Sequence, residues 1–408
     1  MGNYIGIVGI LVILGIAFAF SSNRKAINLR IVGAAFALQA LIAFVVIRTD
    51  GGRNVIESIS VGVRKVMEYS NAGIDMVFGP LANTDFFGGA VSFAVHVLPM
   101  IIFFAALMSV MYHLRIMQLI VKLVGTALQK IIGTGPIESM NAAANIFIGQ
   151  TEAPLVVRPY LKGLNNPQFF TIMVSGVCSV AGTVLVAYTT FGADMRYLLA
   201  ASFMAAPGGL LMANLLMPNE MATDTTSVSQ LKMEKSSHGN VFLAAAAGAG
   251  DGLRLAVNIG AMLIAFVALI ALFNGLVGGV AGWFGYELTL QKILGWVFAP
   301  LMYVLSIPWA DAQAAGALFG EKLILNEFVA FINLNEYLGD ASERTRAIVT
   351  FSLCGFANLS AIAILLGGLG VLVPEKKELI GKFGLRAVLA GSLSNLMSAA
   401  LAGLLLTM

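Results

Sequence analysis

The chain has 408 residues, of which 59% are hydrophobic and only 11% are charged, and its mean hydropathy is +0.89. Soluble domains carry about 25% charged residues, so this composition excludes a large soluble enzyme and indicates a polytopic membrane protein. The net charge of +3 is dispersed and forms no basic stripe, which argues against nucleic-acid binding.

Eight apolar segments are long enough to cross about 30 Å of hydrocarbon as helices, which takes roughly 20 residues each. They lie near residues 4–20, 31–48, 91–112, 167–190, 197–217, 256–274, 346–373 and 385–407. The first segment is long and has no basic region before it, so we interpret it as a transmembrane helix rather than a cleavable signal peptide. The sequence therefore predicts an all-α protein with eight transmembrane helices.

Basic residues between these segments set the expected orientation, because Lys and Arg concentrate in cytoplasmic loops. Arg24, Lys25 and Arg30 follow the first segment, which places that loop inside and the N-terminus outside. If each later segment crosses the membrane in turn, most Lys and Arg residues fall in loops on the inside. Both termini are therefore predicted to lie on the external side.

Two stretches are predicted to be interfacial helices that lie along the membrane surface. Residues 54–79 mix Val, Ile and Met with charged residues, and residues 114–131 repeat the pattern. The polar stretch 218–240 is the clearest internal boundary. Together with the hairpins described next, these features divide the chain into an N-terminal scaffold part, a first transport repeat, a second scaffold part and a second transport repeat. The corresponding ranges are 1–136, 137–217, 218–307 and 308–408.

A first re-entrant helical hairpin is predicted over about 137–163, where polar residues interrupt an apolar segment. The first half is compatible with a helix up to Ile148, and Gly149 can end it. Thr151 can then cap a second half-helix, with Glu152 in its first turn. Each half is too short to cross the membrane alone.

A second hairpin is predicted over about 308–338. Its first half is expected to end near Gly320, and Asn326 is expected to cap the second half, with Glu327 in the first turn. Three spans lie between the hairpins, so the second should enter from the opposite side of the membrane. Broken helices in matching positions of two halves are typical of an inverted repeat in a transporter.

Following segments also match between the halves: Cys178 lies 26 residues after Glu152, and Cys354 lies 27 residues after Glu327. Neither cysteine belongs to a metal-ligand or disulfide pattern, and both are interpreted as small buried residues.

The polar residues of the two hairpin tips suggest binding of a sugar or a base. Glu152 and Glu327 would each sit at a half-helix N-terminus, where free N–H groups stabilise negative charge. The amides of Gln150 and Asn358 can each donate and accept, which suits a nucleobase edge, and Phe356 can pack against a ring.

A monovalent cation is the second possible ligand. Oxygen atoms for it could come from unwound backbone and short polar side chains beside the first hairpin. The candidates are Asn145, Ile148, Ser179 and Val180. Because Asp and Glu do not cluster, a divalent metal site is not expected.

Three other interpretations remain open from the residues alone. Glu152 could form a structural pair with Arg158, although six residues of separation place them poorly on one helical face. An intramembrane enzyme would need a nucleophile–base pair, and no Ser/His or Asp/His constellation is evident. A channel is less consistent with two asymmetric polar tips than alternating access is.

Three motifs resemble the concentrative nucleoside transporter family. Residues 149–159 (GQTEAPLVVRP) resemble the first-hairpin motif, residues 320–331 (GEKLILNEFVAF) the signature of the second hairpin, and residues 354–358 (CGFAN) the seventh-helix motif. The resemblance extends over nearly the whole chain from about residue 91. It implies eight membrane helices with two opposed hairpins, a homotrimer, and a transport domain that moves as an elevator.

The resemblance also implies roles for individual residues. Gln150, Thr151, Glu152 and Val184 would face the base, Glu327 and Asn358 would bind the ribose, Phe356 would lie near the ring, and Leu255 would line the pocket. The sodium site would consist of Asn145, Ile148, Ser179 and Val180.

The chain departs from the family at Ala361, where many members have a second serine after Ser360, and this leaves the purine–pyrimidine preference open. The form Thr-Glu-Ala-Pro at residues 151–154 resembles sodium-coupled members, whereas proton-coupled relatives tend to carry Ser-Glu-Asn. The prediction is a sodium-coupled symporter that imports nucleosides such as uridine, adenosine or cytidine across a bacterial inner membrane. The alternative is a proton-coupled nucleoside transporter in which Glu152 or Glu327 titrates.

Overall fold

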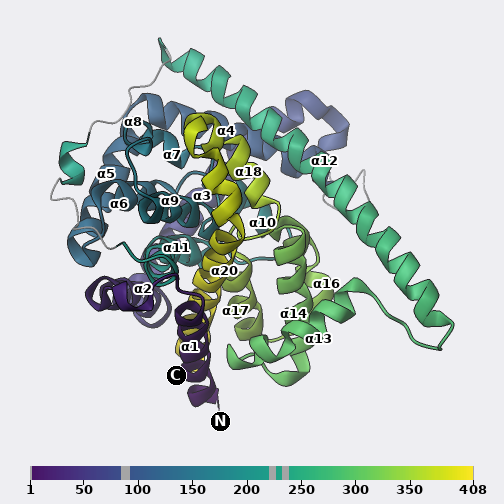
Figure 1. Cartoon of the computed structure of the whole chain (residues 1–408). Coiled ribbons are helices and arrows are strands. Elements are labelled where there is room, and N and C mark those ends of the chain that lie inside the picture. The colour runs from purple at the N-terminus through teal and green to yellow at the C-terminus, as the bar shows by residue number, and fades with distance from the viewer. Residues whose placement is uncertain (1, 84–91, 220–226, 232–238, 408) are drawn as a thin grey trace.

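The computed structural model describes residues 2–83, 92–219, 227–231 and 239–407, and every regular element in this part is a helix (Figure 1). Six of the described helices are long and apolar enough to cross a membrane. The first and seventh predicted spans contain shorter apolar helices, Ile5–Ala19 and Ala361–Leu372. Each of the eight predicted segments thus coincides with a helix or a broken helix, although residue 91 lies outside the described part. The predicted all-α fold is confirmed.

The N-terminal region, up to His113, contains four long helices. They are α1 (Gly2–Ala19), α2 (Leu29–Arg48), α3 (Asp50–Phe78) and α4 (Leu98–His113), the last preceded by a single π-helical turn, η4 (Phe93–Val97). Helix α3 covers the predicted interfacial stretch 54–79, and Thr49 caps it by accepting a hydrogen bond from the Gly52 N–H at 3.0 Å. Its polar face is exposed, and the buried residues Ile56, Ser60, Ser70 and Ile74 form one narrow side of the helix.

Two successive units of the chain repeat the same order of helices. After α4, the first unit contains α5 (Ile116–Ile132), α6 (Pro136–Ala144), α7 (Ala153–Val156), α8 (Arg158–Leu161), α9 (Asn166–Cys178), α10 (Gly182–Thr189) and α11 (Met195–Leu216). After α12 (Val241–Gly282), the second contains α13 (Leu290–Val304), α14 (Trp309–Ile324), α15 (Glu327–Ile332), α16 (Leu334–Leu338), α17 (Glu343–Leu353), α18 (Ala361–Gly367), α19 (Leu369–Leu372) and α20 (Lys377–Thr407).

In each unit an amphipathic helix leads into a hairpin of two half-helices, then a helix that breaks midway, then a long helix. Helices α6, α7 and α9 begin at residues 136, 153 and 166, and their counterparts α14, α15 and α17 begin at 309, 327 and 343. The predicted inverted repeat with two hairpins is therefore present. Helix α5 covers the second predicted interfacial stretch, and α13 is its counterpart, bent by 119° against α14.

Three predicted boundaries are wrong. The first half-helix ends at Ala144, before Ile148, and a non-helical turn follows it up to Gly149. Thr151 does not cap the second half; Glu152 occupies the N-cap position of α7 without a side-chain capping bond. Helix α14 continues past Gly320 to Ile324. Gly320 serves the packing of α14 against α13, since a Cβ at this position would lie 2.6 Å from the Leu294 Cβ.

The sixth predicted span, 256–274, is only the centre of the 42-residue helix α12, which crosses one side of the molecule in Figure 1. Helices α4 and α12 pack along each other but bury little of their apolar surface. Gly248 and Gly252 allow close approach, since a Cβ on Gly248 would lie 2.7 Å from the Ala105 carbonyl oxygen. The Ser109 hydroxyl donates to the Ala244 carbonyl at 2.7 Å and adds an interhelical hydrogen bond.

The hydrophobic core lies among α9, α11, α17 and α20, whose apolar residues are almost all buried. The first halves of both broken helices, α9 and α17, therefore lie inside the protein rather than against lipid. Irregular backbone at membrane depth is tolerated in such a place, because the surrounding protein can satisfy its polar groups.

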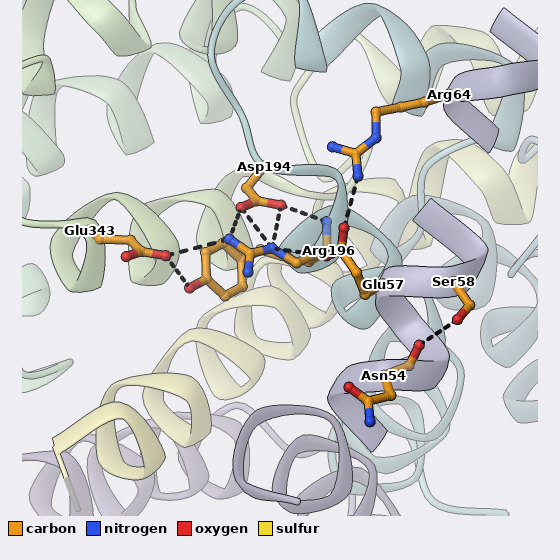
Figure 2. Close-up of polar contacts among 8 residues, drawn as sticks. Asn54, Glu57, Ser58, Arg64, Asp194, Arg196 and Glu343 are labelled. Carbon is orange, nitrogen blue, oxygen red and sulfur yellow. Dashed lines mark hydrogen bonds and ion pairs between the residues drawn. The ribbon is translucent and has the colours of Figure 1, made fainter. Parts of the chain in front are cut away.

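A charge cluster joins α3 to the starts of α11 and α17 (Figure 2). Arg196 Nε donates to both carboxylate oxygens of Asp194, at 3.0 and 2.9 Å, and also lies 3.7 Å from the Glu57 carboxylate. Its Nη2 lies 3.5 Å from the Glu343 carboxylate, and Arg64 pairs with Glu57 at 2.9 Å. One guanidinium thus faces three carboxylates from three segments. Partial burial raises the pKa of Asp194, but hydrogen bonds and charge from Arg196 outweigh it and hold the pKa below its ordinary value.

We expect Arg196→Met to lower the melting temperature in detergent at pH 7, whereas Arg53→Met, in the exposed pair with Asp50, should change it little. Exposed ion pairs contribute about 0–1 kcal/mol each to the free energy of unfolding, so loss of the pairs that Arg196 makes should lower this free energy by about 1–2 kcal/mol. Because the folded-state pKa of Asp194 is depressed, its contribution is present at neutral pH and is lost as the pH falls through that pKa. The difference between Arg196→Met and the parent should therefore shrink below about pH 4. Equal melting curves at pH 7 would contradict this account.

Candidate functional site

A cavity of about 730 Å³ lies between the two hairpin tips, the two helix breaks and helices α4 and α12. This volume is within the range of pockets that enclose a small organic ligand, about 300–1,000 Å³. All eight residues predicted to bind substrate line it. They are Gln150, Thr151, Glu152, Val184, Leu255, Glu327, Phe356 and Asn358.

At the second hairpin tip a carboxylate is held in a defined position. Glu327 is buried, and its Oε1 accepts a hydrogen bond from the Tyr188 hydroxyl at 3.0 Å while its Oε2 accepts one from the Asn358 amide at 3.0 Å. Asn326 caps α15 as predicted, because its side chain accepts from the Val329 N–H at 3.0 Å. Glu327 therefore begins a helix, where the helix dipole stabilises its charge.

The first hairpin tip is more open. The Glu152 side chain is accessible on the cavity wall, and a Cβ on Gly149 would lie 2.6 Å from its carboxylate. Gly149 therefore lets the carboxylate fold back over the turn. Thr151 packs on the other repeat, where a Cβ on Gly368 would lie 2.7 Å from its methyl group. Gln150 is buried, and its amide oxygen has no hydrogen-bond partner among the described residues.

The four residues predicted to bind sodium lie where the first hairpin meets the break between α9 and α10. Asn145 is buried; its Nδ2 donates to the Asn141 carbonyl at 3.0 Å, which leaves its Oδ1 without a described partner. The carbonyls of Ile148 and Val180 lie in non-helical backbone, and no described hydrogen bond ends on either. Of the four, only Ile148 also lines the cavity.

The two segments that carry these oxygens are in contact, because the Gly182 N–H donates to the Phe147 carbonyl at 3.1 Å. The Ser179 hydroxyl donates to the Ser175 and Gly176 carbonyls at 3.2 and 3.3 Å, so its lone pairs remain free to accept. Neutral oxygens without partners suit a hard monovalent cation. In the part of the chain that the structure describes, no three His, Cys, Asp or Glu side chains group as a metal site.

Family models match three successive parts of the chain. One described as "Na+ dependent nucleoside transporter N-terminus" matches residues 8–81, one described as "Nucleoside recognition" matches residues 94–195, and one described as "Na+ dependent nucleoside transporter C-terminus" matches residues 197–403. The chain belongs to the concentrative nucleoside transporter family.

Curated relatives extend over the full length of this transporter. It is 48% identical to the nucleoside permease NupC of Helicobacter pylori, over 98% of this chain and 96% of that protein. It is 47% identical to the uncharacterized transporter YutK of Bacillus subtilis, over 98% of both. Human solute carrier family 28 member 3 is 35% identical, over 97% of this chain and 59% of the human protein.

Solved structures of the nucleoside transporter CNTnw share the fold. The inward-facing, substrate-bound structure is 47% identical and matches with a TM-score of 0.95, over 100% of this chain and 98% of that chain. A variant in an outward-facing state is 46% identical and matches with a TM-score of 0.94 over the same shares. The chain is therefore a membrane transporter and not an enzyme.

Tyr188 lies at the centre of the transporter's second tip, but it was not identified as a site residue from the sequence. Besides donating to Glu327, its ring stacks on Phe331 with centroids 4.2 Å apart and meets Phe328 edge-on at 5.1 Å. A lone Tyr in the apolar run of α10 was the available signal, since a buried Tyr hydroxyl usually has a hydrogen-bond partner.

Ala361, the departure from the family pattern, is buried in the first turn of α18. Its N–H donates to the Asn358 Oδ1 at 2.8 Å, and the Ser360 hydroxyl donates to the same atom at 2.7 Å. The orientation of the Asn358 amide is therefore fixed by local bonds that do not need a hydroxyl at position 361.

We expect Tyr188→Phe to raise the KM for nucleoside uptake by about tenfold, because a hydrogen bond to a charged group contributes about 1.5–3 kcal/mol. The ring stack on Phe331 remains in this variant, so expression and assembly should be unchanged. Tyr197→Phe is the matched control, since the Tyr197 hydroxyl also donates to a carboxylate, that of Glu343, outside the cavity. Equal KM values in the two variants would show that the hydroxyl of Tyr188 does not support the site.

Proposed function

We propose that this transporter is a sodium-coupled symporter that imports nucleosides such as uridine, adenosine or cytidine across a bacterial inner membrane. One observation carries the proposal: both hairpin tips face the same cavity, and beside the first tip lie buried oxygen atoms without partners. A small polar ligand and a small cation can therefore bind next to each other, with the first hairpin in contact with both.

Glu327 and Asn358 are proposed to bind the ribose. They form one connected unit in which the carboxylate accepts and the amide donates, as a sugar with adjacent hydroxyls requires. Gln150, Thr151, Glu152 and Val184 are proposed to face the base, with Phe356 near the ring and Leu255 on the wall. Support for this division comes from their positions: Gln150, Thr151, Glu152 and Val184 belong to the first repeat, Glu327 and Asn358 belong to the second, and all of them line the one cavity.

Asn145, Ile148, Ser179 and Val180 are proposed to hold the sodium ion. Binding there would supply a partner for the unpaired Asn145 oxygen and order the turn that leads to Gln150 and Glu152. Sodium would then raise nucleoside affinity, and nucleoside would raise sodium affinity by the same factor. The proton-coupled alternative has to use Glu152 or Glu327, and it leaves the four neutral oxygens of the predicted sodium site without a role.

An elevator-type movement within a homotrimer is proposed for the transport cycle. The two repeats share one core, whereas α4 and α12 form a separate, poorly buried pair along the cavity. That pair is suited to be the scaffold, with lipid and neighbouring subunits covering its apolar faces. Both termini are proposed to be external, as the distribution of basic residues predicts.

Glu327→Gln should lower nucleoside affinity by about 10- to 100-fold, because hydrogen bonds to a charged group become hydrogen bonds to a neutral one. The measurement is uptake of labelled uridine and adenosine into proteoliposomes under an imposed sodium gradient. Glu336→Gln, on the exposed surface of α16, is the control. Normal uptake by Glu327→Gln would show that the ribose assignment is wrong.

Asn145→Ala should raise the sodium concentration for half-maximal uptake by about tenfold, since one ion ligand is removed. Nucleoside affinity at saturating sodium should change less. Asn214→Ala is matched to it, because both amides donate to the carbonyl four residues earlier, at 2.8 Å in Asn214 and 3.0 Å in Asn145. Uptake that follows a pH jump and ignores sodium would establish the proton-coupled alternative.

A further inference from the structure

Lys322 is a fully buried lysine near the end of α14, and neither proposed ligand site uses it. Its ammonium donates to the Ser352 carbonyl at 2.8 Å and to the Asn395 Oδ1 at 2.7 Å, and it lies 5.6 Å from the centre of the Phe319 ring. These partners are neutral oxygens and a ring face. Burial of a charge is costly unless the surrounding groups compensate it, and here these contacts and the charge of Glu327 do so.

The partners of Lys322 lie where both broken helices end. Asn395 on α20 donates through its Nδ2 to the Cys178 carbonyl at 2.7 Å and to the Cys354 carbonyl at 2.9 Å. These carbonyls belong to the C-terminal ends of α9 and α17, where the helix dipoles are negative. A cation is favoured at such a point, and the ammonium group of Lys322 is a cation that is covalently attached to the protein.

The two repeats differ in how their buried oxygens are satisfied. In the first, the amide oxygens of Asn141, Asn145 and Gln150 are buried without a described partner. In residues 308–372 of the second repeat, all of which the structure describes, no buried side-chain oxygen lacks a partner. The hairpin and broken helix of the first repeat thus have acceptors and no cation, whereas those of the second, residues 308–372, have a cation and no spare acceptors.

We propose that Lys322 is a positioning residue that does in the second repeat what sodium is proposed to do in the first. Each cation joins the first half of a hairpin to the end of the broken helix in the same repeat. In the second repeat this link runs from α14 to α17 and is permanent. This inference rests on the proposed sodium coupling, and it predicts that the second repeat binds no sodium while Lys322 is present.

The test counts sodium ions by equilibrium binding of labelled sodium to purified transporter in the presence of uridine. Lys322→Met removes the charge and leaves the Ser352 and Asn395 oxygens free, so it should bind about one more sodium ion than the parent. The Hill coefficient of sodium-driven uptake should rise from about one to about two, because this coefficient is bounded by the number of sites. Lys322→Arg should keep the parent's count.

Lys292→Met is the control, because Lys292 also donates to a carbonyl, that of Glu287, at the surface. An unchanged sodium count in Lys322→Met overturns the inference, whether or not uptake is lost, since a merely structural lysine would lower stability or rate alone. If Lys322→Met does not give monodisperse protein, Lys322→Gln, which retains a hydrogen-bond donor, is counted instead. A parent that binds no sodium would refute the proposed function, whereas a sodium-binding parent with an unchanged variant would refute only the role of Lys322.

Discussion

The structure depends on one amide, that of Asn395, which holds the ends of both broken helices. A helix that stops inside a membrane leaves carbonyl groups without partners, and each costs several kcal/mol unless the protein satisfies it. Asn395 donates to one such carbonyl from each repeat. Gly355 makes room for it, since a Cβ there would lie 2.3 Å from the Asn395 oxygen. The polar backbone of both breaks can therefore lie at the centre of an apolar core and form part of a binding site.

Hydrogen bonds between the hairpins and the breaks extend this arrangement to the cavity. The Gly182 N–H donates to the Phe147 carbonyl in the first repeat, and the Leu359 N–H donates to the Leu323 carbonyl in the second, both at 3.1 Å. Across the repeats, the Phe356 N–H donates to the Ser179 carbonyl at 3.0 Å. These hydrogen bonds therefore connect each tip to its own break and connect the two breaks to each other. The proposed ligands, which would contact different tips, would thus act on one connected backbone.

Local sequence signals predicted the elements well and the long-range contacts poorly. Apolar length located all eight spans, and Asn326 was identified as a cap because capping depends on neighbouring residues. Gly320 was misjudged because a glycine can end a helix or admit a neighbouring side chain, and only the position of Leu294 distinguishes the two. Thr151 was wrong as a cap because α7 begins one residue later than expected, with Glu152 at its N-cap position.

The site residues missed in the sequence share the same limitation. Tyr188 bonds a residue 139 positions away, and Asn395 bonds carbonyls 217 and 41 positions away. Neither belongs to the motifs that made the hairpins recognisable. The predicted substrate residues converged on one cavity because those motifs describe the tips themselves. Supporting residues come from α10 and α20, and single-sequence reasoning has no means of placing these helices against the tips.

An inverted repeat would give two equivalent half-sites if its halves had identical side chains. Here the second tip is already connected, through Tyr188 and Asn358, and its hairpin is tied to the helix break by Lys322. The first tip has an accessible Glu152 and a buried Gln150 whose oxygen lacks a described partner. We therefore propose that the sodium ion, by supplying the missing charge, lets the first hairpin close. Under the proposed sodium coupling, the link between ion and nucleoside binding would reside in the first hairpin, and the second hairpin would be the fixed surface against which the first closes.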